Sequence, residues 1–187
     1  MTRNFNTYIE NPAVDYLREL CLREGTLRRY ERGEAFFSAG SVARYFGYIK
    51  SGTLKYVAYG DDGTEHVLGL EFAGEFVTDF PFSLRGQKAR TSVIAESPCE
   101  IYCVSTAALA DRLESDPGFR EIVMRGTEAV FSTVYDRYVD LHCKTAQQRY
   151  NDLISRYPDL FSLFPLKDIA SFLNITPTHL SRLRKNI

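Results

Sequence analysis

The C-terminal segment Pro165–Ile187 constrains the fold of this chain more than any other stretch, because it predicts two short helices joined by a sharp turn. The first helix is expected over Leu166–Leu173, where apolar residues recur at helical spacing. Asn174 follows, and asparagine tolerates the left-handed backbone that a tight helix exit needs. Thr176 is then a natural N-cap, and Pro177 suits the first position of the second helix. The segment therefore predicts a helix-turn-helix.

The second helix has one apolar side and one polar, basic side. Leu180 and Leu183 are spaced to pack on the first helix, which leaves the other side chains on or near an outer face: Thr178, His179, Ser181, Arg182 and Lys185. Arginine can read guanine through two hydrogen bonds, and lysine or serine can hold phosphate. The pattern favours DNA binding. The alternative is an ordinary antiparallel helix pair with a solvated basic end.

Charge is distributed unevenly along the chain. The formal net charge is −1, yet the residues from His142 onward carry seven Lys or Arg against three Asp, which gives this part +4 and the preceding part −5. A basic C-terminal part on an acidic body fits a local contact with nucleic acid. The alternative is that a surplus of four positive charges in this part arises by chance.

The composition indicates a cytoplasmic protein without a resident metal. Met1–Glu10 is polar and does not resemble a signal peptide, and no apolar run is long enough to span a membrane. The four cysteines are scattered in the sequence, so we expect reduced thiols rather than a metal site: Cys21, Cys99, Cys103 and Cys143.

Between Thr26 and Val104 the chain consists of short segments rich in Tyr, Phe, Val and Ile, separated by glycine-centred turns. The turn Asp61–Gly63 is typical of a hairpin. Strands are expected over Arg44–Lys50, Thr53–Tyr59, Glu65–Phe72, Arg90–Ala95 and Glu100–Val104. Many short antiparallel strands with regular turns indicate a β-roll of the double-stranded jelly-roll type.

Helical patterns flank the strands. Helices are expected over Pro12–Arg23, Thr106–Ser115, about Phe119–Lys144 and Ala146–Arg156. The long third helix carries one predicted stripe, which favours dimerisation along it, although packing on the β-roll would also account for it: Ile122, Ala129 or Val130, Thr133 or Val134, Tyr138 and Leu141. The sequence thus predicts an α+β protein with three parts, at residues 1–118, 119–145 and 146–187.

Several motifs occur in an order that resembles the Crp/Fnr family of bacterial transcription regulators: Gly33-Glu34, Gly40, Tyr48–Lys55, Gly60–Glu65, Ala73–Phe76 and Ile169–Arg182. The resemblance covers nearly the whole chain. It implies a sensory β-roll, a long dimerisation helix, and a helix-turn-helix that binds a near-palindromic double-stranded DNA site as a homodimer. RNA polymerase would be a further partner if the protein is an activator.

The resemblance also bears on the effector. Cyclic-AMP binders of this family hold the phosphate with a Gly-Glu-Leu turn and a later Arg-Ser or Arg-Thr. Gly74-Glu75-Phe76 and Arg90-Thr91 resemble these elements, but Ala89 aligns with the family's arginine. Since a shift of one residue turns a strand side chain to the opposite face, cyclic AMP is not the expected effector. Lys88 and Arg90 could line a pocket for another anion. Only Cys21 could serve an N-terminal iron–sulfur cluster, and His66 and His142 are weak candidates for haem ligands.

For DNA, the resemblance implies contacts from Thr176, Pro177, Thr178, His179, Ser181, Arg182 and Lys185. Arg182 is the expected base contact. Pro177 replaces an arginine of the cyclic-AMP branch, so we expect a different operator. The sequence ends at Ile187 without the family's full two-stranded wing, so a shallower salt dependence is expected. One alternative is a ligand-binding signalling module whose C-terminal helices bind a protein. A cupin-type enzyme is disfavoured, because there are only three histidines, far apart in sequence.

Overall fold

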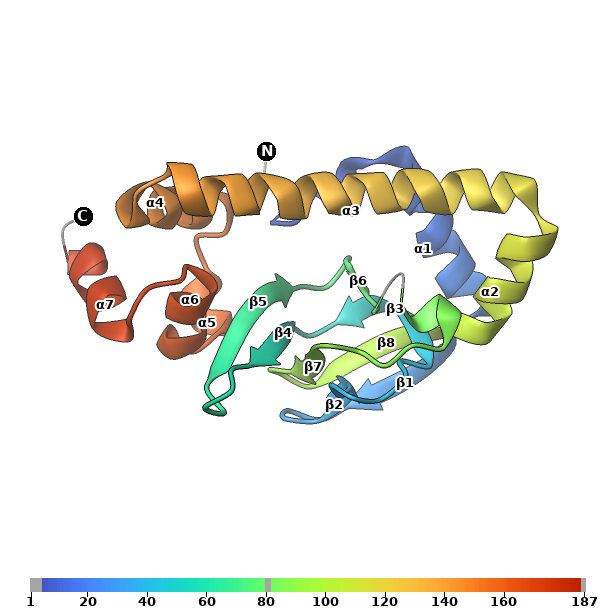
Figure 1. Ribbon diagram of the computed structural model, residues 1–187, viewed down its shortest axis with the longest axis horizontal. Helices are drawn as coiled ribbons and strands as arrows, with labels where there is room; N and C mark the ends of the chain where they lie inside the picture. Colours follow the sequence, from blue (N-terminus) through green and yellow to red (C-terminus); the bar gives the residue numbers. More distant parts are fainter. Residues whose placement is uncertain (1–4, 80–81, 186–187) are drawn as a thin grey trace.

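The computed structural model describes residues 5–79 and 82–185, and Figure 1 shows a β-roll lying beneath one long helix, with a small helical unit at one end. The predicted helix-turn-helix is described except for its last two residues. The helical elements are η1 Thr7–Glu10, α1 Pro12–Glu24, η2 Ser83–Arg85, α2 Thr106–Ser115, α3 Pro117–Cys143, α4 Ala146–Arg156, α5 Leu160–Leu163, α6 Leu166–Phe172 and α7 Pro177–Lys185.

The strands form two antiparallel sheets that face each other, as the sequence predicted for an α+β chain with a jelly-roll-type β-roll. One sheet has the order β1-β8-β3-β6 and the other has β2-β7-β4-β5. Their core contains Ile49, Leu54, Val93 and Ile101, all fully buried. The strands are β1 Thr26–Tyr30, β2 Ala35–Phe37, β3 Tyr45–Ser51, β4 Leu54–Tyr59, β5 Glu65–Glu71, β6 Phe76–Val77, β7 Ser92–Ala95 and β8 Cys99–Ser105.

The hairpin between β4 and β5 forms where the sequence placed it. Gly63 has a φ of 77°, and the backbone N–H of Gly60 donates to the carbonyl of Thr64 at 2.9 Å. The Asp62 side chain accepts from the Thr64 N–H at 2.9 Å, which closes the turn. Glycine provides the left-handed backbone at low cost, and aspartate supplies the local hydrogen bond.

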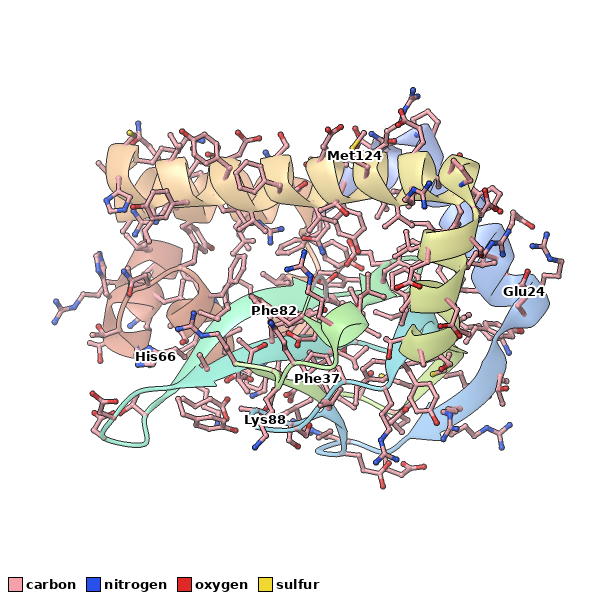
Figure 2. The ribbon with its side chains drawn as sticks, turned by 45° about the vertical axis from the view of Figure 1, so that its right-hand side comes forward. Glu24, Phe37, His66, Phe82, Lys88 and Met124 are labelled. Carbon is pink, nitrogen blue, oxygen red and sulfur yellow. The ribbon has the colours of Figure 1, made fainter. Side chains whose placement is uncertain are left out.

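The long helix α3 begins after Asp116, whose side chain accepts from the Phe119 N–H at 3.0 Å. The prediction of a single apolar stripe on α3 is wrong in detail, because these residues lie on two faces of the helix, one packed inward and one exposed. Ile122 and Ala129 are half-buried and Thr133 is buried, whereas Val134, Tyr138 and Leu141 are exposed. Figure 2 shows Met124 on the outer side of α3, away from the β-roll. Packing on the β-roll and an exposed apolar surface therefore coexist on one helix.

The helix-turn-helix packs on strand β5 of the same chain. Strand β5 is at the end of its sheet, and the Ser171 side chain of α6 accepts from its Val67 N–H at 2.9 Å. Nearby, the ammonium group of Lys55 in β4 lies 2.8 Å from an Asp168 carboxylate oxygen in α6 and 2.9 Å from one of Glu65. Burial lowers the pKa of Lys55, but the hydrogen bonds to Asp168 and Glu65 outweigh it and raise the pKa.

Within the described ranges, no helix is both long and apolar enough to cross a bilayer. No cluster of three or more metal-ligating His, Cys, Asp or Glu side chains occurs among those residues. Cys21, Cys99 and Cys103 are buried and Cys143 is exposed, all as free thiols. The division into parts at residues 118 and 145 stays a prediction.

We expect Lys55→Ala to lower the free energy of unfolding by about 3–5 kcal/mol, because it leaves Asp168 buried without its cation. Urea unfolding followed by circular dichroism measures the change. The matched control is Lys50→Ala, which removes an exposed lysine that pairs with Glu100 and should cost much less. Equal losses in the two variants would show that the buried pair does not hold α6 on the β-roll.

Candidate nucleic-acid interface and effector cavity

The turn between α6 and α7 is built from local hydrogen bonds. Asn174 has a φ of 54°, its N–H donates to the Ser171 carbonyl at 2.9 Å, and the Ile175 N–H donates to the Ala170 carbonyl at 3.0 Å. This is the Schellman arrangement, with asparagine at the left-handed position. The Thr176 side chain then caps α7 by accepting from the His179 N–H at 3.2 Å. These features confirm the predicted roles of Asn174 and Thr176.

Helix α7 presents the predicted outer face. Leu180 and Leu183 are buried against α6, together with Ile169 and Ala170. Ser181 is half-buried, and six of the predicted DNA-contacting residues are exposed: Thr176, Pro177, Thr178, His179, Arg182 and Lys185. The Arg184 guanidinium instead lies 4.1 Å from the centre of the Phe161 ring. Arg182 and Lys185 are therefore the two cations of α7 that lie on its outer face. Their contact with DNA stays a prediction.

The six predicted effector residues do not converge on one site. Gly74 adopts a φ of 92° in a turn, and the Glu75 carboxylate, 2% exposed, accepts from the Phe72 N–H at 2.9 Å. Lys88 and Arg90 are exposed and Thr91 is half-buried, whereas Ala89 is 4% exposed. Figure 2 shows Lys88 pointing away from α3. Phe76 lines the cavity described below. The inward Ala89 and outward Arg90 agree with the shift inferred from the sequence, and an effector contact stays untested.

A buried polar cluster connects the N-terminal segment, β5, the Gly74 turn and α3. The Asn6 side-chain amide donates to Glu75 at 2.7 Å and to Glu71 at 3.0 Å, and the Arg137 guanidinium donates to the Asn6 side-chain oxygen. Tyr8 donates to Glu71 at 3.4 Å. Burial and the adjacent Glu75 carboxylate raise the pKa of Glu71 well above its usual range, and burial also raises the pKa of Glu75.

A cavity of about 510 Å³ lies between the β-roll and helices α1, α2 and α3. Its walls are mainly apolar, and its polar groups include Glu71, Asp79, Ser83 and Arg137. A second cavity of about 560 Å³ lies between β5, α3, α4 and α6. The Asn6–Arg137 cluster was not predicted from the sequence. The one usable signal was an arginine on the inward side of the long helix, since even a partly buried arginine requires acceptors.

The structure combines a jelly-roll-type β-roll, a helix of 27 residues laid across it and a capped helix-turn-helix. The class of protein is therefore a β-roll of the cyclic nucleotide-binding type joined to a helix-turn-helix unit. Residues 27–116 match the Cyclic nucleotide-binding domain family. The chain is thus similar to Crp/Fnr-type regulators, in sequence to one relative and in fold to solved members.

Among known proteins, the chain is 27% identical over 170 residues to the fumarate and nitrate reduction regulatory protein of Yersinia pestis. The match covers 82% of this chain, and the chain spans 65% of that relative's length. FixK2 from Bradyrhizobium japonicum has a similar structure, with a TM-score of 0.75, 16% identity, and 87% and 83% of the two chains covered. A Crp/Fnr-family protein from Eubacterium rectale gives a TM-score of 0.72 at 13% identity, with 94% and 86% covered. These two structures share the fold.

We expect the free energy of unfolding to fall as the pH rises from 5 to 8, with Glu71 as one cause. A carboxyl group whose pKa is raised in the folded state stabilises the fold while protonated. That stability is lost as the pH rises from the unfolded value, about 4.3, through the folded one. Glu71→Gln should therefore show a smaller loss than the wild type in urea unfolding. Glu128→Gln, at an exposed position of α3, is the control. Identical slopes for Glu71→Gln and the wild type would contradict the assignment.

Proposed function

We propose that this protein is a homodimeric, sequence-specific DNA-binding transcription regulator, in which helix α7 enters the major groove. The observation that carries the proposal is the exposed outer face of α7, with Arg182 and Lys185 on it, on a helix whose other side is anchored by the buried Leu180 and Leu183. A rigid helix that presents an arginine and short polar side chains fits the edges of bases and the flanking phosphates.

The charge distribution supports the same function. The part of the chain from residue 142 carries a charge of +4, and this part includes α4, α6 and α7. Figure 1 places these helices together at one end of the molecule, away from α1 and α2. Positive charge concentrated at one end attracts the phosphate backbone locally, while the acidic remainder limits unspecific binding elsewhere on the surface.

Dimerisation is proposed through the exposed apolar face of α3. Phe131 is 67% exposed, and it belongs to a larger set of exposed apolar side chains on the same helix: Met124, Val130, Phe131, Val134, Tyr135, Tyr138, Val139 and Leu141. A contiguous apolar surface of this kind is unusual on a monomer. Packing the same face of a second copy against it gives a symmetric dimer with two α7 helices, as a near-palindromic DNA site requires. Action on DNA and free thiols together favour the cytoplasm.

Arg182→Ala should abolish the preference of the protein for its DNA site. A site is first selected from random oligonucleotides with the wild type, and the affinities for this site and for random DNA are then compared by gel shift. Loss of one two-pronged guanine contact should reduce discrimination by about tenfold or more. Arg18→Ala, which removes a half-exposed arginine of α1 at the opposite end of the molecule, should leave discrimination unchanged.

Unchanged discrimination in Arg182→Ala would remove Arg182 from its assigned role. Failure of the wild type to enrich any sequence would refute the DNA-binding function. It would favour the alternative in which the C-terminal helices bind a protein.

Phe131→Glu should convert the dimer into a monomer, because it places an unpaired charge in the centre of the proposed apolar interface. Sedimentation velocity at micromolar concentration measures the change. Ser132→Glu introduces the same side chain one residue further along, about 100° around the helix, and should remain dimeric. A Phe131→Glu protein that stays dimeric would place the interface elsewhere.

A further inference from the structure

The cavity beneath α3 is large enough for a small organic molecule. Its volume of about 510 Å³ lies within the range of about 300–1,000 Å³ that is usual for small-molecule sites. The β-roll and the helices that cover it both contribute to the cavity wall. Phe46 and Phe76 come from the β-roll, and Leu109 and Val123 come from α2 and α3. An apolar cavity of this size favours an apolar body over a hydrated one.

Most polar groups at the cavity wall are already occupied. The Tyr56 hydroxyl donates to the Thr78 carbonyl at 2.8 Å and accepts from the Thr78 N–H at 2.9 Å. The Arg137 guanidinium donates to Asn6 and lies 5.0 Å from the centre of the Phe5 ring. Among the described residues of the wall, Arg137 is the one cation, and one of its N–H groups is engaged with Asn6.

Two polar side chains of the wall differ from the rest. Asp79 is 9% exposed and Ser83 is 5% exposed, and in the part of the chain that the structure describes, Asp79 Oδ2 and Ser83 Oγ are buried without any hydrogen-bond partner. Leaving a buried acceptor unsatisfied is unfavourable, and such groups in folded proteins usually mark a missing partner. Burial also raises the pKa of Asp79, so a donor beside it would stabilise its ionised form.

We propose that this cavity binds a small, mainly apolar molecule whose single polar end donates hydrogen bonds, an amine or a hydroxyl group, to Asp79 and Ser83. A molecule ending in a carboxylate or phosphate is rejected, because it would place an anion beside Asp79 in a medium of low polarity. Of the phosphate-binding motif considered in the sequence, Phe76 lines the cavity, whereas Gly74, Glu75 and Arg90 do not. The proposal concerns ligand binding and does not depend on the DNA-binding function.

The test uses three probes that share a biphenyl body and differ in the polar end: 4-phenylbenzylamine, 4-phenylbenzyl alcohol and 4-phenylbenzoate. Isothermal titration with the full chain at pH 7.5 measures each affinity. We expect saturable binding of the amine and the alcohol, and binding of the benzoate that is weaker than that of the amine by about tenfold or more. Cyclic AMP is titrated as a fourth ligand and should bind no better than the benzoate.

Two variants assign the binding to the cavity. Asp79→Asn, which preserves the size of the side chain, should lower the affinity for the amine by about tenfold and remove its advantage over the benzoate. Ser83→Ala should lower the affinity for the alcohol. It provides a second readout if Asp79→Asn folds poorly. Asp111→Asn makes the same change at an exposed position of α2 that does not line the cavity, and should match the wild type.

Three results would overturn the proposal: no saturable binding of any of the three probes, equal affinity for the amine and the benzoate, or amine binding that neither Asp79→Asn nor Ser83→Ala alters. DNA enrichment with the same preparation keeps the two proposals apart. A protein that selects a DNA sequence but binds no probe refutes the ligand site alone, and one that binds the amine but selects no sequence refutes the DNA-binding function alone.

Discussion

The arrangement of this molecule depends on Arg137, whose side chain is half-buried where three parts of the chain meet. The guanidinium donates a hydrogen bond to Asn6 and lies near the side chains of Glu71 and Glu75. Its central carbon, Cζ, is 5.4 Å from the centre of the Phe172 ring in α6. A partly buried cation needs nearby acceptors, and here they come from the N-terminal segment and the β-roll. One side chain of α3 therefore fixes that helix to the β-roll and also contacts the helix-turn-helix.

The helix-turn-helix is not an independent appendage, because it shares a hydrophobic core with the β-roll. Val67 and Leu70 of β5 belong to the same buried cluster as Ile169 and Leu180 of α6 and α7. Helix α6 also covers β5 at the end of its sheet, where an uncovered strand would offer free N–H groups to other chains. The contact thus protects a sheet edge as well as positioning the proposed recognition helix.

The sequence predicted features that local chemistry decides, and missed those that depend on distant partners. Asn174 and Thr176 could be assigned because a left-handed exit and an N-cap need only their neighbours. Strand β1 was not among the expected strands because its five residues are mostly exposed and show no alternation. The buried partners of Arg137, and the unpaired groups of Asp79 and Ser83, depend on chain segments that only the fold brings together. The one-residue shift at Ala89 was inferred from a strand expected over Arg90–Ala95, but β7 begins only at Ser92, so Ala89 and Arg90 lie in the segment before it.

The fixed orientation of α7 has a consequence for the proposed dimer. At the other junction, Lys144 lies 2.9 Å from Asp140 of α3 and 2.7 Å from Asp152 of α4, and these partly exposed ion pairs contribute little. The core that the helix-turn-helix shares with β5 therefore limits its rotation against α3 within one chain. The spacing of the two α7 helices would then be set by how the two α3 helices cross. The cavity borders this contact through Phe131, so a bound molecule could alter DNA affinity by favouring one crossing geometry over another.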